Sequence, residues 1–85
     1  MKVDRSKLVI EPVAWNDRDY TIRYAGEYVG CIKLVGESEY QVAVSMQREG
    51  EKILQECGRA DSIETGAETV AYHWLLIREH ERKQT

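Results

Sequence analysis

Four residues carry the side chains that most often bind soft metals or act as nucleophiles and bases: Cys31, Cys57, His73 and His80. A local zinc motif needs two such ligands close together, for example two cysteines separated by two to four residues. The two cysteines are far apart in the sequence. The two histidines would fall two turns apart on a helix, too far to chelate one ion. We therefore expect no metal site and no cofactor.

Nucleophilic catalysis would require a histidine beside Cys31 or Ser45, held in place by a third group. His73 lies between Tyr72 and Trp74 in a predicted helix, and we expect its ring to point away from the strands that carry these two nucleophiles. A chain of 85 residues also has little room to enclose a substrate. The sequence therefore predicts that the protein is not an enzyme.

Gly26 and Gly30 stand close together in the segment RYAGEYVGCI, residues 23–32. Phosphate-binding loops use such glycines, but they are followed by a helix and carry a lysine with a serine or threonine. Here Glu27 lies inside the segment and a strand pattern follows it. We therefore predict that Gly26 forms a hairpin turn and that Gly30 allows close packing.

The composition is that of a folded chain, with 42% hydrophobic and 32% charged residues, and we treat residues 1–85 as a single small domain. No apolar run is long enough to span a bilayer, and the first residues do not have the pattern of a secretory signal. With two cysteines, this favours reduced thiols and a cytoplasmic location. The net charge of −3 disfavours non-specific nucleic-acid binding. A homodimer is a reasonable expectation, because small domains often gain stability by oligomerising.

Five runs of residues have strand character, and short turns join them. The clearest is residues 40–46, in which polar and apolar residues alternate. Pro12 places the first run at a sheet edge, and residues 16–19 read as a polar turn. The predicted strands are residues 8–10, 20–24, 28–35, 40–46 and, as a shorter fifth strand, 53–57. Short connections predict an antiparallel meander.

A helix is predicted after residue 61, because apolar residues then recur at helical spacing through Val70 and Trp74. Either Ser62 or Asp61 can cap it, and Asp61 with Glu64 has the spacing of a capping box. The predicted fold is α+β: an antiparallel meander of four to five strands with one C-terminal amphipathic helix packed on one face. The strand residues expected to face the helix are Tyr20, Ile22, Tyr24, Tyr40, Val42, Val44 and Met46.

The length of the turn at Gly26 decides which side chains of the following strand are buried. A two-residue turn pairs Tyr24 with Glu27 and turns Val29 and Cys31 toward the core. A three-residue turn turns Ile32 inward and Cys31 outward, and we favour it because it buries more apolar surface.

Candidate partner-binding residues are two aromatic side chains expected outside the core and four acids expected at turns. Tyrosine and tryptophan are enriched at interface hot spots, and clustered acids can mimic phosphates toward a basic surface. The candidates are Trp15, Tyr28, Glu37, Glu39, Glu49 and Glu51. As an alternative, the sheet face opposite the helix would display Arg23 and Lys33, which could contact nucleic acid.

The order of elements resembles that of small proteins encoded by bacteriophages and other mobile elements. The matching residues are Tyr20, Gly26, Val29-Gly30-Cys31-Ile32, Ser62-Ile63-Glu64, Ala67, Ala71 and Trp74. One branch of this resemblance is the arm-binding domain of tyrosine integrases, which implies DNA binding by a sheet backed by a helix. The other is the small acidic phage inhibitors, anti-CRISPR proteins among them, which implies a protein that covers a surface of a host defence complex.

From these observations we expect a non-enzymatic protein-binding module, a phage-type acidic inhibitor of a host nucleic-acid-handling or defence complex. The alternative is a nucleic-acid-binding module.

Overall fold

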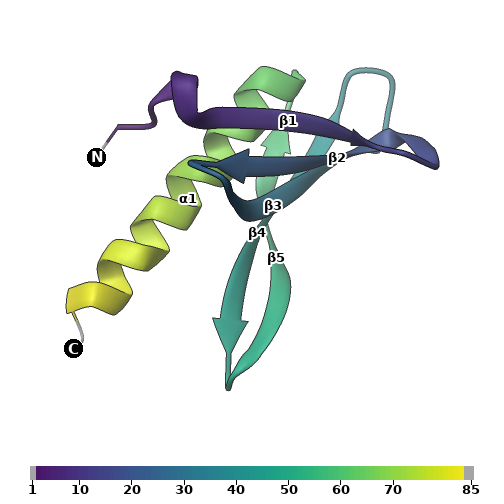
Figure 1. Ribbon diagram of the computed structural model, residues 1–85. Coiled ribbons are helices and arrows are strands. Elements are labelled where there is room, and N and C mark those ends of the chain that lie inside the picture. Colours follow the sequence, from purple (N-terminus) through teal and green to yellow (C-terminus); the bar gives the residue numbers. More distant parts are fainter. Residues whose placement is uncertain (1, 84–85) are drawn as a thin grey trace.

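The computed structural model describes residues 2–83, with all their side chains except those of residues 16 and 17. Its elements are a 3-10 turn η1 (Arg5–Lys7), β1 (Leu8–Val13), β2 (Asn16–Tyr24), β3 (Glu27–Leu34), β4 (Tyr40–Arg48), β5 (Glu51–Ala60) and α1 (Ile63–Lys83). The strands form one antiparallel sheet in chain order, and α1 lies across one of its faces (Figure 1). The predicted meander with a C-terminal helix is confirmed, with five strands.

Four strands, β1, β2, β4 and β5, are longer than the sequence predicted. The polar segment 16–19 belongs to β2, and the turn before it is formed by Ala14 and Trp15 instead. The register between β1 and β2 is irregular there, since Pro12 pairs with Tyr20 and Val13 with Asn16. The fifth strand is the longest of the sheet, because β4 continues to Arg48 and gives β5 a partner along its whole length.

The β2–β3 hairpin combines both predicted registers. Its turn has two residues, Ala25 and Gly26, both with positive φ (53° and 84°), as a tight hairpin turn requires. Tyr24 therefore pairs with Glu27, so the favoured three-residue turn was wrong. A bulge then inserts one extra residue, Val29, and beyond it Tyr20 pairs with Ile32. The bulge buries both Val29 and Ile32 completely, which neither simple register would do.

The N-terminus of α1 is capped by Ser62, whose Oγ accepts a hydrogen bond from the Thr65 backbone N–H at 3.1 Å. Ser62 was one of the two predicted caps. Gly66, in the first turns of the helix, is buried, and a Cβ there would lie 3.0 Å from both Ile32 Cδ1 and Val42 Cγ1. This glycine therefore lets the helix lie close to the sheet.

The core lies between α1 and the sheet face that the alternation predicted. Ile22, Val42 and Val70 are completely buried, and Trp74 packs against them at the edge of the core. Gly30 is also buried. Val70 packs directly over it, and a Cβ at that position would lie 2.6 Å from Val70 Cγ1. Helix and sheet therefore approach each other most closely at two glycines, Gly66 on α1 and Gly30 on β3.

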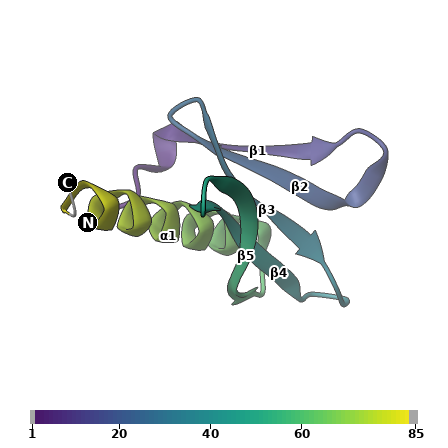
Figure 2. The same cartoon turned by 90° about the horizontal axis from the view of Figure 1, so that it is seen from below.

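The C-terminal half of α1 and the β4–β5 hairpin project from the sheet in different directions (Figure 1). A view turned by 90° shows the helix extending beyond the sheet at its C-terminal end (Figure 2). The space between these two projections is the candidate functional site.

Candidate functional site

The site begins where β3 and β4 stop pairing. The last pair of their ladder is Gly30 with Val44, although β3 starts three residues earlier, at Glu27, and β4 continues to Arg48. The two strands therefore diverge toward this end of the sheet, and the C-terminal half of α1 projects to one side of the β4–β5 hairpin (Figure 1).

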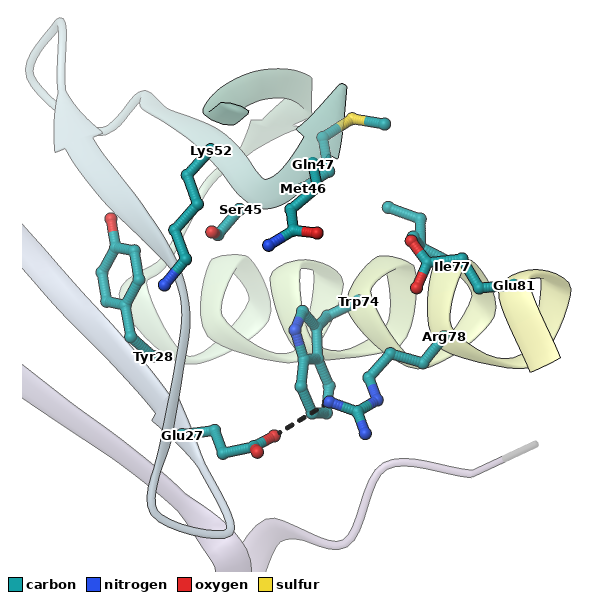
Figure 3. A pocket seen from close by; sticks show the side chains of 10 residues that line it. All are labelled: Glu27, Tyr28, Ser45, Met46, Gln47, Lys52, Trp74, Ile77, Arg78 and Glu81. Atoms are coloured by element: carbon teal, nitrogen blue, oxygen red, sulfur yellow. Dashed lines mark hydrogen bonds and ion pairs between the residues drawn. The ribbon is translucent and has the colours of Figure 1, made fainter. Parts of the chain in front are cut away.

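A groove with a volume of about 410 Å³ lies in this opening (Figure 3). We call it the β3–β4 groove. Trp74 and Ile77 give it an apolar floor, and most of the other side chains that line it are polar or charged. Its lining residues are Glu27, Tyr28, Ser45, Met46, Gln47, Lys52, Trp74, Ile77, Arg78 and Glu81.

Trp74 is held in place from two sides. Its ring packs against Tyr24 with the centroids 6.3 Å apart and the planes tilted by 57°. The Arg78 guanidinium lies 4.8 Å from the centre of the Trp74 ring, in a cation–π contact, and its Nη1 donates to Glu27 Oε2 at 3.2 Å. The indole thus has one well-defined position and borders the groove (Figure 3). An indole held in this way can anchor an apolar group of a partner with little loss of entropy.

The backbone of β4 contributes unpaired groups to the groove. The β4–β5 turn consists of Glu49 and Gly50, both with positive φ, so the flanking residues Arg48 and Glu51 exchange both hydrogen bonds. Because the pattern alternates along an antiparallel ladder, Ser45 and Gln47 direct their N–H and C=O groups away from β5, toward β3. The last β3–β4 pair is Gly30 with Val44, so among the described residues Gln47 is the residue of this kind that lies clear of the β3–β4 ladder. The groove therefore offers a short open strand edge beside an apolar floor.

The charges around the groove are of both signs. Arg78 and Glu27 neutralise each other in an exposed ion pair. The Lys52 side chain extends toward Tyr28 and Ser45, while Glu81 lies on the helix side near Ile77 (Figure 3). No strong field of one sign is built here, so the groove suits a peptide more than a phosphate or nucleic-acid chain.

The structure does not gather the predicted partner-binding residues into one patch. Trp15 is 88% exposed at the tip of the β1–β2 hairpin. Glu37 and Glu39 lie in the β3–β4 connection, at the same end of the meander as Trp15. Glu39 is engaged by Arg59, whose Nη1 lies 2.7 Å from Glu39 Oε1.

The remaining candidates lie at the opposite end of the sheet. Glu49 is in the β4–β5 turn and Glu51 is the first residue of β5, both exposed. Tyr28 lines the β3–β4 groove, and partial burial raises the pKa of its hydroxyl, with a smaller contribution from the Cys31 thiol. Of the predicted set, only Tyr28 is part of the groove.

The open sheet face carries the two cations of the nucleic-acid alternative, but one of them is neutralised. Arg23 Nε donates to Glu11 Oε1 of the neighbouring strand at 2.9 Å. Lys33 is exposed and pairs in register with Asp19 on one side and Gln41 on the other.

Both thiols are free and half-buried. Burial raises the pKa of Cys31 above its ordinary value, and Asp19 adds to the rise. Burial likewise raises the pKa of Cys57. An activated nucleophile needs the opposite shift. Among residues 2–83, no three histidine, cysteine, aspartate or glutamate side chains come together in a way that could hold a metal ion.

The sequence placed most groove residues on their elements but did not identify the groove; Glu27, Gln47 and Lys52 were expected outside the strands that carry them. Trp74 was predicted as part of the apolar helix stripe and Met46 as an inward strand residue. One signal was available: α1 is 21 residues long, so at 1.5 Å per residue its end must pass beyond a sheet of this width. An apolar stripe that continues to Ile77 therefore had to remain partly uncovered.

Comparison of the chain with protein-family models, with curated protein sequences and with solved structures found no match. No helix in the described range 2–83 is long and apolar enough to cross a membrane.

Proposed function

We propose that this protein is a non-enzymatic, cytoplasmic protein-binding module that takes an extended segment of its partner into the β3–β4 groove. The observation that supports this most directly is the open β4 edge at Gln47, which lines the same groove as the indole of Trp74. Proteins commonly bind extended peptides by strand addition, in which main-chain hydrogen bonds give affinity and a neighbouring pocket gives specificity.

The chemistry of the partner segment follows from the groove. Alternate residues of an added strand point to opposite faces, so one side chain in two would reach the floor at Trp74 and Ile77. An aliphatic or aromatic side chain suits that floor. A flanking acid would suit Lys52, since the cation Arg78 is already paired with Glu27.

Peptide display against the wild-type protein tests this proposal, with counter-selection against Ile77→Asp, which places a charge in the floor. Selected peptides are then titrated into ¹⁵N-labelled protein. We expect amide shifts at residues 27–29 and 45–48 and at the Trp74 indole. Peptides that shift Trp15 or the open sheet face instead, or that bind wild type and Ile77→Asp equally, would refute it. Val35→Asp is a control, because it adds the same charge at an exposed valine that directly follows the other end of β3.

Within this function, we carry forward the partner class that the resemblance implied: a host nucleic-acid-handling or defence complex, inhibited by an acidic phage-type protein. Its support is the net charge of −3 and the exposed carboxylates of Glu37, Glu49 and Glu51. Reversal of these three charges to lysine should abolish inhibition of such a complex in a reconstituted cleavage assay. Unchanged inhibition would remove phosphate mimicry as the mechanism.

The Arg23–Glu11 pair bears on the nucleic-acid alternative, because it leaves the open face with little net positive charge. A mobility-shift assay at low and high salt decides it. Binding that appears at low salt and is lost in Lys33→Glu would favour the alternative over the groove.

A further inference from the structure

The outer edge of β5 is a second surface with a definite pattern. Residues 51–56 pair regularly with β4, and the ladder is interrupted only beyond them, where Cys57 is inserted as a bulge. Among the described residues no strand lies on the other side of β5, because it ends the sheet order. The opposite edge, β1, is different: it contains Pro12 and an irregular register, features that discourage strand pairing.

The alternation of the β4–β5 ladder decides which backbone groups of β5 face outward. Since Glu51 exchanges hydrogen bonds with Arg48, Ile53 and Gln55 also bond to β4, and Lys52, Leu54 and Glu56 point their N–H and C=O groups away from it. One contact agrees with this assignment: the Glu56 carbonyl accepts a hydrogen bond from the Gln55 side-chain amide at 3.3 Å.

The same three residues share one face of the sheet, because side chains alternate with period two. They are a cation, a leucine and an acid. Leu54 is 52% exposed, among the most exposed of the large aliphatic side chains that the structure describes. No ion pair is recorded for Lys52 or Glu56 in residues 2–83.

We propose that a second copy of this chain pairs antiparallel with β5 about a two-fold axis at Leu54. Leu54 then lies opposite Leu54 of the other copy, and Lys52 lies opposite Glu56 on both sides of it. All three outward-facing residues find hydrogen-bonding partners, and both charge pairs are of opposite sign. The two sheets join into one, with Leu54 and its copy in contact on the face away from α1.

The other registers are poorer for physical reasons. Outward-facing residues must pair with outward-facing residues, which restricts the choice to two-fold axes at Lys52, Ile53, Leu54, Gln55 or Glu56. An axis at Lys52 or Glu56 places like charges opposite each other. An axis at Ile53 pairs Leu54 with Lys52 and leaves Glu56 without a partner among the three outward-facing residues. An axis at Gln55 pairs Leu54 with Glu56 and leaves Lys52 without one. Only the axis at Leu54 gives Lys52, Leu54 and Glu56 each a suitable partner in the other copy.

The interface is a strand edge, so it falls at the small end of specific interfaces and the dimer should be weak. Sedimentation velocity and NMR diffusion from about 10 µM to about 1 mM cover dissociation constants typical of such contacts. We expect wild type to shift from monomer to dimer within this range. Wild type that stays monomeric throughout would refute the proposal.

Charge reversal makes the test specific to this register. Lys52→Glu and Glu56→Lys should each weaken self-association about tenfold, because each places two like-charged pairs at the interface. An equimolar mixture of the two variants should restore association, since every pair in the heterodimer is again of opposite sign. A mixture no better than either variant alone would refute the register. Circular dichroism of each variant verifies that it folds.

Leu54→Lys should abolish the dimer, and Val9→Lys is its matched control, because Val9 is exposed on the other edge strand. Equal loss in both variants would show a general effect of added charge and would overturn the assignment to β5. Lys52 also lines the groove, so the two proposals are separated by other variants: Ile77→Asp alters the groove without changing the outer edge of β5, and Leu54→Lys alters that edge without changing a groove residue.

Discussion

Replacing Gly30 with alanine places a methyl group at the closest approach between α1 and the sheet. The added Cβ would lie 2.2 Å from the Ala43 carbonyl oxygen and 2.6 Å from Val70 Cγ1. Both distances are far below an ordinary contact between nonbonded heavy atoms. The Ala43 oxygen is part of the β3–β4 backbone and cannot turn away as a side-chain end can. Relief therefore requires β3 and β4 to separate next to the groove.

The cost follows from these two contacts. Overpacking of a core costs roughly 1–3 kcal/mol, and weakening one ladder hydrogen bond adds about 1 kcal/mol. We expect a loss of about 2–4 kcal/mol in the free energy of unfolding. At roughly 0.05–0.15 kcal/mol per residue, this would be a large part of the total stability of a chain of this size.

Urea unfolding followed by circular dichroism and tryptophan fluorescence measures the effect. With a urea m-value of about 1 kcal/mol/M, the midpoint should fall by about 3 M. Gly36→Ala is the control: a Cβ there would lie 3.5 Å from Glu39 Cβ, so its midpoint should barely move. Val70→Ala in the Gly30→Ala background should cost less than it does alone, because it relieves one of the two clashes. Wild-type stability of Gly30→Ala would refute the close approach.

Three further predictions concern the helix and the thiols. Gly66→Ala should destabilise by no more than about 1 kcal/mol in the same urea assay, because the gain in helix propensity offsets contacts with two flexible aliphatic ends; a loss as large as that of Gly30→Ala would contradict this. Ser62→Ala should lower the free energy of unfolding by about 1 kcal/mol and Ser62→Asp should restore most of it, since the cap accepts from the Thr65 N–H; an equal loss in both variants would refute a capping role. Cys31 and Cys57 should react more slowly with iodoacetamide at neutral pH than a free thiol does, because burial raises the pKa of both. Since the unfolded thiols lose their protons first, stability should fall as pH rises through the ordinary thiol range; fast alkylation at neutral pH would contradict the raised pKa values.

The local elements were predictable because their signals are local. The alternation along residues 40–46 depends on the two-residue period of a strand, and Ser62 can cap a helix because of its own side chain. The presence of a turn at Gly26 was predictable because glycine adopts positive φ without strain, although the length of the turn was not. The exposed position of Tyr28 was predicted in the same way. The groove around it was not, because its other walls come from β4, β5 and α1.

The bulge at Val29 shows most clearly what tertiary structure decided. Within the hairpin alone, either Val29 or Ile32 faces the core, because side chains alternate. The extra residue becomes favourable only when α1 covers both side chains, and the benefit of burying two apolar residues outweighs one irregular pair. The divergence of β3 and β4 just before this bulge, and hence the groove, is likewise a property of the packed sheet and helix. By itself the sequence therefore determined the elements and the face each one buries. The register, the groove and the free edge of β5 were decided where separate elements compete for the same core.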